Sequence, residues 1–150
     1  MCDNLIVKWK FINNQKEINN WNKEIYNFSD GNYFQSIEWA NYKFNYGWDT
    51  YRFIAQDRKG KILSLAQILV RVYPFSNCIA WCPGGPIGNV STINEDFINI
   101  CVKAIGCSRI YLRISPLSAY ELINKDKLIS NGWKSPKYKL ATGLSMDINL

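Results

Sequence analysis

The chain of 150 residues contains no histidine. This absence excludes Ser-His-Asp and Cys-His nucleophilic sites and metal centres that depend on histidine. No apolar run reaches the roughly 18 residues that cross a bilayer. The N-terminus, MCDNLIVKWKF, also lacks the basic start and apolar core of a signal peptide. We therefore expect a cytoplasmic protein whose chemistry would depend on carboxylates, lysine, tyrosine or backbone groups, or mainly on positioning.

Acidic side chains are scarce relative to basic ones, with 12 Asp and Glu against 18 Lys and Arg and a net charge of +6. This charge indicates anionic partners: phosphates, nucleic acid or the inner membrane surface. No two carboxylates form a convincing acid/base pair, so we assign no catalytic residue. We also assign no cofactor and no metal. The five cysteines fit neither a disulfide framework nor a zinc site, and we expect small buried hydrophobic residues. They are Cys2, Cys78, Cys82, Cys101 and Cys107.

Hydrophobic periodicity predicts one domain over residues 1–150, with the element order β-α-α-β-β-β-α-β-α-β. Three successive strands with short links indicate an antiparallel meander, and βαβ-like units follow it. The fold class is therefore α/β (α+β), a mixed, largely antiparallel sheet flanked by helices. The expected strands are 5–11, 50–56, 61–73, 77–82, 109–115 and 140–150, and the expected helices are 15–27, 34–46, 93–105 and 118–132.

Three residues of the expected second helix lie at i, i+4 and i+8 and would share one face: Gln35, Trp39 and Lys43. In one interpretation Trp39 is a core residue and the aliphatic stem of Lys43 covers its edge. In the other, an aromatic shelf holds the ammonium and directs it at a phosphate. The same pattern predicts that Ser36 caps the start of this helix and that Gly47 ends it.

The stretch IAWCPGGPIG places two prolines and three glycines directly after an apolar strand. It matches neither GxxxxGK[ST] nor GxGxxG, so it is not a standard phosphate loop. Gly84, Gly85 and Pro86 form either a structural turn or a backbone surface that a ligand approaches closely.

Arg113 lies in an otherwise apolar strand, RIYLRIS. A charge in such a strand must be paired or must face a cleft. The candidate partners for a structural ion pair are Asp49, Asp57, Glu38 and Asp147.

Four segments in this order resemble the first domain of the FemABX peptidoglycan-bridge aminoacyltransferases. They are FQSIEWANYKFNYGW, GKILSLAQILVRVYPFSNCIAWCPGGPIG, RIYLRISP and the closing NGWKSP…TGLSMDINL. Each motif is short, and the specificity lies in their order and spacing over residues 33–150. The resemblance implies a GNAT-like domain that has lost acetyl-CoA binding.

By this resemblance, the chain would transfer an amino acid from aminoacyl-tRNA to a muropeptide precursor, either lipid II or a UDP-linked pentapeptide. An amine attacks an activated ester in such a reaction, and positioning can supply most of the catalysis. Full-length family members carry a second GNAT-like domain. The resemblance therefore implies an N-terminal half that needs a second domain to use aminoacyl-tRNA.

The resemblance also assigns roles to individual residues. Lys43 matches the helix lysine that contacts the precursor's phosphates, and Trp39 and Gln35 match its packing scaffold. The turn of Gly84, Gly85 and Pro86 would border the precursor cleft and bring backbone N–H groups near the ligand. Arg113 matches the strand arginine of the family.

One departure concerns Ser115, which stands before Pro116 where the family commonly has an acidic residue. If that carboxylate helps to activate the amine, its loss puts catalysis in doubt. Two other functions stay open: a GNAT-type N-acyltransferase that uses acyl-CoA, and a non-catalytic module that pairs with another chain through a sheet edge near 140–150.

Overall fold

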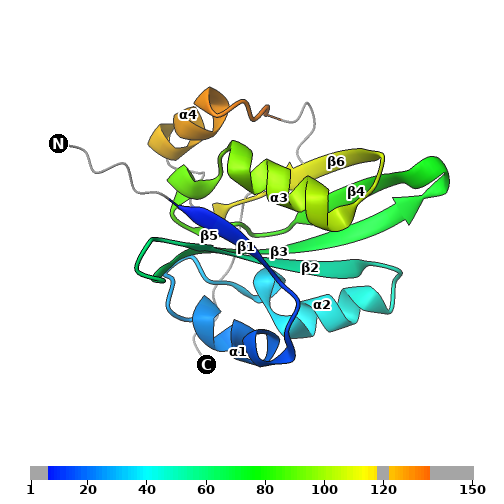
Figure 1. Ribbon diagram of the computed structural model, residues 1–150, viewed down its shortest axis with the longest axis horizontal. Helices are drawn as coiled ribbons and strands as arrows, with labels where there is room; N and C mark the ends of the chain where they lie inside the picture. Colours follow the sequence, from blue (N-terminus) through cyan, green and yellow to red (C-terminus); the bar gives the residue numbers. More distant parts are fainter. Residues whose placement is uncertain (1–6, 118–121, 136–150) are drawn as a thin grey trace.

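A computed structural model describes residues 7–117 and 122–135. One mixed sheet lies between two helical layers, with α1 and α2 on one face and α3 and α4 on the other (Figure 1). The strands are β1 (Lys8–Ile12), β2 (Asp49–Gln56), β3 (Ile62–Tyr73), β4 (Asn77–Cys82), β5 (Ile87–Gly88) and β6 (Arg109–Ile114). The helices are α1 (Gln15–Ile25), α2 (Ile37–Phe44), α3 (Glu95–Ile105) and α4 (Leu122–Ser130).

The sheet has the order β1-β2-β3-β4-β6, and β5 pairs with β3 beside this path. All pairs from β1 to β4 are antiparallel, so the predicted meander is confirmed. Helix α3 connects β4 to the parallel strand β6, where Trp81 lies opposite Arg113. The predicted fold class, a mixed and largely antiparallel sheet flanked by helices, is therefore confirmed.

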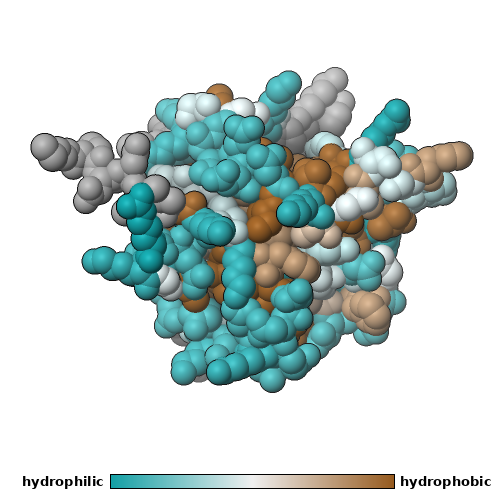
Figure 2. All heavy atoms as spheres, in the orientation of Figure 1, coloured by the Kyte–Doolittle hydropathy of each residue, from teal (hydrophilic) through white to brown (hydrophobic). Residues whose placement is uncertain are grey.

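Each face of the sheet buries its own apolar cluster. The face under α3 includes Phe53, Ile68 and Phe97, and the face under α1 includes Trp21 and Leu65. Figure 2 shows hydrophobic side chains in the middle of this face and toward the end where the β3–β4 hairpin lies, among hydrophilic ones. No helix of the described residues is both long and apolar enough to cross a bilayer.

The described cysteines behave as expected for small apolar residues. Cys78, Cys82 and Cys101 are buried, and Cys107 is half-buried. Burial raises the pKa of the Cys78 thiol to about 12, so this group is neutral at physiological pH. Cys2 lies outside the described residues.

The predicted helix 34–46 is wrong at its start. Residues Tyr33–Gln35 form a separate 3₁₀ turn, and Ser36 is extended, with φ −79° and ψ 161°. Helix α2 then begins at Ile37, where Ser36 caps it by accepting a hydrogen bond from the Trp39 N–H at 3.2 Å. Gln35 therefore precedes α2 and does not share a helix face with Trp39.

The strand prediction differs from the structure at residues 87–88 and is not tested at residues 140–150. No strand is predicted within the glycine-rich segment, but Ile87–Gly88 returns to the sheet and pairs with Ser64 and Leu65. A strand of two residues is too short to show a periodic pattern. The predicted strand 140–150 lies outside the described residues.

The Gln35 side chain is completely buried and connects three parts of the fold. Its Nε2 donates to the Pro83 carbonyl at 2.7 Å and to the Gln67 carbonyl at 3.2 Å. Its Oε1 accepts from the Gln67 N–H at 2.7 Å. One amide thus joins the 3₁₀ turn to the middle of β3 and to the bend after β4.

Gln67 extends this buried network. Its Nε2 donates to the Ser36 carbonyl at 2.7 Å, and its Oε1 accepts from Arg52 Nε at 2.9 Å. The Arg52 guanidinium lies 5.7 Å from the Trp21 ring centroid, and burial lowers its pKa to about 10. The Trp21 indole N–H in turn donates to the Gln35 carbonyl at 2.7 Å. Every polar group of the two glutamine side chains is therefore paired.

We expect Gln35→Ala to lower the free energy of unfolding by about 3 kcal/mol or more, because it leaves the Pro83 carbonyl and the Gln67 N–H buried without partners. Urea unfolding followed by tryptophan fluorescence measures the loss. The matched control is Gln15→Ala, which removes an exposed bond to Asn19 and should cost less than about 0.5 kcal/mol. Similar losses in both variants would contradict the structural role of Gln35.

Candidate functional site

The glycines of the bend make room for the protein's own side chains. Gly84, Gly85 and Pro86 are buried. Gly84 has φ +63°, and a Cβ there would lie 2.4 Å from Asn32 Oδ1. A Cβ on Gly85 would lie 2.7 Å from Gln35 Cδ. Both contacts are far too short for a side chain, so the two positions require glycine because of internal packing.

Hydrogen bonds hold the bend on both sides. Asn32 Nδ2 donates to the Gly84 carbonyl at 2.8 Å, and the Gly88 N–H donates to the Asp30 carboxylate at 3.0 Å. The Ser115 N–H donates to the carbonyls of Gly85 at 2.9 Å and Cys82 at 3.1 Å. These contacts agree with the structural-turn interpretation. They make the bend a fixed support on which β4 and β6 end together.

Lys43 rests on a cluster of aromatic rings. Its Nζ lies 4.8 Å from the ring centroid of Trp39, 5.8 Å from that of Tyr42 and 5.9 Å from that of Trp81. Within the described part of the chain, Lys43 forms no ion pair. Ring faces attract an ammonium group without neutralising its charge. Lys43 therefore keeps a positive charge that is available to an anion.

The same cluster contains two unpaired hydrogen-bond donors. The indole Nε1 atoms of Trp39 and Trp81 are shielded from solvent, and neither has a hydrogen-bond partner among residues 7–117 and 122–135. By contrast, the indoles of Trp9 and Trp21 donate to the carbonyls of Thr92 and Gln35, both at 2.7 Å. A buried unpaired donor costs about 1–3 kcal/mol, and such exceptions call for an explanation. Two of them beside Lys43 single out this cluster as the candidate site.

Sequence reasoning missed Trp81, although it lies inside the quoted glycine-rich stretch. Its side chain lies on the face of β4 opposite to Cys78 and Cys82, toward α2, where it contacts Lys43. The Trp48 ring is 6.3 Å away. The period of two along β4 could have placed Trp81 on this face, but only tertiary packing brings Lys43 to it.

Arg113 is positioned beside this cluster by the parallel pairing of β4 and β6. It lies opposite Trp81 in the register, so the two side chains emerge on the same face of the sheet. It forms no ion pair with Asp49, Asp57 or Glu38 among the described residues, and Asp147 lies outside them.

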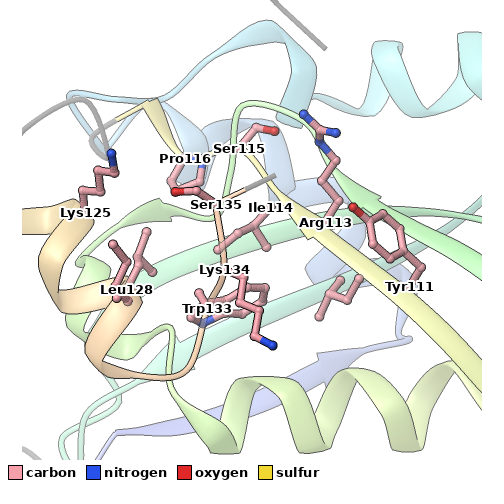
Figure 3. Close-up of a pocket in the computed structure, with 12 residues that line it drawn as sticks. Tyr111, Arg113, Ile114, Ser115, Pro116, Lys125, Leu128, Trp133, Lys134 and Ser135 are labelled. Atoms are coloured by element: carbon pink, nitrogen blue, oxygen red, sulfur yellow. The ribbon is translucent and has the colours of Figure 1, made fainter. Parts of the chain in front are cut away.

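Arg113 also lines a pocket of about 260 Å³ at the edge of β6 (Figure 3). In this view its guanidinium projects away from Trp133 and Lys134, which lie on the side of α4. The described residues that line the pocket include Lys125 and Lys134 but no carboxylate. The pocket therefore suits an acidic group and offers no carboxylate as a general base, consistent with Ser115 in place of an acid.

The predicted site residues thus divide into two groups. Lys43, Trp39 and Arg113 lie around Trp81 and have charge or donors to offer a ligand. Gln35 and the bend of Gly84, Gly85 and Pro86 lie beneath them and are bonded within the protein, so we assign them a positioning role.

We expect the cost of Gly85→Ala to depend on Gln35. In the wild-type background the new Cβ must displace the Gln35 amide, at about 1–3 kcal/mol. In a Gln35→Ala background the obstacle is gone, and the cost should fall by at least about 1 kcal/mol. A double-mutant cycle of urea unfolding measures this coupling. Additive losses would show that Gly85 is required for another reason.

A family model described as the FemAB family matches residues 14–145. Among solved structures, the chain is similar to one described as the crystal structure of FemX, at 18% identity and a TM-score of 0.49. That alignment covers 65% of this chain and 23% of the FemX chain, so our chain spans about a quarter of FemX. Comparison with curated proteins gave no match.

Two acetyltransferase structures align over most of both chains at low identity. One, from Trypanosoma brucei, has 9% identity and a TM-score of 0.47 and covers 95% of this chain and 99% of its own. The other, glucosamine-6-phosphate N-acetyltransferase from Arabidopsis thaliana, has 11% identity and a TM-score of 0.47 and covers 90% and 97%. The family match covers most of our chain and confirms the resemblance seen in its motifs: the chain belongs to the FemAB family.

Proposed function

We propose that this chain binds a muropeptide precursor, lipid II or a UDP-linked pentapeptide, as the acceptor domain of a peptidoglycan-bridge aminoacyltransferase. The observation that carries the proposal is the cluster around Trp81. There the Lys43 ammonium lies beside two indole donors, all three without a polar partner in the part of the chain that the structure describes, with Arg113 on the adjacent strand. Both forms of the precursor contain a pyrophosphate, which such a set of donors recognises.

The proposed reaction needs little from the protein besides positioning. The precursor's amine attacks the ester carbonyl of an aminoacyl-tRNA, an amide forms, the acyl C–O bond breaks, and the tRNA leaves with its hydroxyl group protonated by the proton that the amine loses. Holding the two groups together can supply most of the acceleration. We assign the chain the precursor side only, because the cluster around Trp81 offers groups for the pyrophosphate. In this proposal residues 1–150 form a single GNAT-like domain, and the tRNA is bound by a second domain.

An acyl-CoA-dependent transfer has less support. Enzymes of that kind place a pyrophosphate at the start of a helix, where the N–H groups are free. The start of α3 is capped by the Asn94 side chain, which accepts from the Phe97 N–H at 3.3 Å. Its first turn also carries Glu95 and Asp96, which repel an anion.

We expect Lys43→Ala to weaken binding of UDP-N-acetylmuramoyl pentapeptide at least about tenfold, the effect of losing one charged hydrogen bond. Isothermal titration calorimetry measures the Kd. The matched control is Lys23→Ala, which removes the same charge from an exposed position on α1 and should leave the affinity within about twofold. An unchanged Kd in the Lys43 variant would reject the site.

A further inference from the structure

Exposed apolar side chains collect at one end of the molecule. They come from the β3–β4 hairpin, the end of α2 and β6. The most exposed is Phe75, at the tip of the hairpin, with 94% of its surface accessible. We call this surface the apolar end; its other members are Val72, Tyr73, Phe44, Tyr46 and Tyr111, all exposed. Figure 2 shows hydrophobic spheres at the same end, where Figure 1 places the hairpin.

Hydrogen bonds hold the parts of the apolar end together. Arg71 on β3 donates to the carbonyls of Tyr46 and Gly47 just after α2. The Ser108 N–H, just before β6, donates to the Ser76 carbonyl of the hairpin at 2.9 Å. The exposed residues therefore belong to one fixed surface.

The hairpin tip presents Phe75 in an unfavourable backbone conformation. Phe75 has φ +63° and ψ 30°, a left-handed geometry that a residue with a bulky side chain seldom adopts. No packing within the described chain offsets this strain, because the Phe75 ring is almost fully exposed. An aromatic ring held outward at such a cost indicates that the ring has an external contact.

The charge around the apolar end is positive. Residues 58–94 contain no Asp or Glu, and neither do residues 97–120. Arg109 at the start of β6 and Lys103 in the last turn of α3 are exposed, and Arg71 lies beside the hairpin. Among the described strands, the acidic residue nearest this end is Asp49, at the start of β2. The surface is thus complementary to an extended anionic layer.

Phe, Tyr and Val between basic side chains form the combination that favours the interface of a lipid bilayer. Aromatic rings insert at the level of the headgroups, and Lys and Arg attract anionic lipids. We propose that the apolar end docks on an anionic membrane surface, with Phe75 inserted among the headgroups and Arg109 and Lys103 above the lipid phosphates. This inference does not rest on the proposed function, because it requires no precursor.

Vesicle flotation tests the proposal with the full chain. We expect the protein to float with vesicles of phosphatidylglycerol and phosphatidylethanolamine and not with neutral phosphatidylcholine vesicles. Phe75→Asn should weaken the binding at least about fivefold, since a buried aromatic side chain is lost from the bilayer. Asn tolerates the left-handed backbone at this position, so the variant should fold. Thermal unfolding checks that it does.

Two further variants make the test specific. Tyr26→Asn removes an aromatic ring that is 86% exposed at the end of α1 and should not change vesicle binding. Arg109→Gln should weaken binding to anionic vesicles and reduce its dependence on salt. The proposal is overturned if the wild-type protein stays unbound, if it binds neutral vesicles equally, or if Tyr26→Asn matches Phe75→Asn. Self-association through Phe75 without vesicles would also overturn it and assign the surface to a second copy of the chain.

Discussion

The buried amide of Gln35 is the constraint on which the rest of the site depends. Its bonds to Gln67 and Pro83 join the turn before α2 to the central strand and to the bend after β4. The position of the bend determines where β4 ends, and that end carries Trp81. Ser115 then bonds to the same bend, so β6 and its Arg113 are placed as well. The geometry of the binding surface therefore follows from one fully paired glutamine.

The polar groups of the glutamine network and those around Trp81 differ in whether they have hydrogen-bond partners. Below the bend, every donor of the glutamine network has an acceptor, as a stable core requires. Around Trp81, two solvent-shielded indole N–H groups have no acceptor among the described residues, and Lys43 forms no ion pair with any of them. Proteins break the rule of polar satisfaction mainly where they bind or react. The contrast between the two layers is the physical basis for assigning support to one and ligand binding to the other.

The sequence predicted the main strands because their apolar patterns are long, and it predicted the Ser36 cap because the capping chemistry is local. It placed Gln35 on the helix wrongly, although the predicted Ser36 cap implies that the helical backbone begins only at the next residue. It could not explain Gly84 and Gly85 either. Their need for glycine comes from Asn32 and Gln35, about fifty residues away in the chain. The family resemblance identified Lys43 as a candidate site residue. The contact between Lys43 and Trp81 could be seen only in the tertiary structure.

Under the proposed function, a site without histidine is chemically reasonable. Attack of an amine on an activated ester needs alignment more than a strong base. The pocket beside Arg113 fits this view, because the described residues that line it are basic or neutral and include no carboxylate. This lining supports the proposal of an acidic acceptor, because basic side chains attract an anion.

The most direct test of this account is the response of the indole N–H signals to the ligand. In ¹⁵N-labelled protein titrated with UDP-N-acetylmuramoyl pentapeptide, the Trp39 and Trp81 indole signals should move as their donors gain an acceptor. Those of Trp9 and Trp21, already bonded within the core, should stay in place. If Trp39 and Trp81 remain unchanged at saturation, the anion is bound elsewhere and the account is wrong.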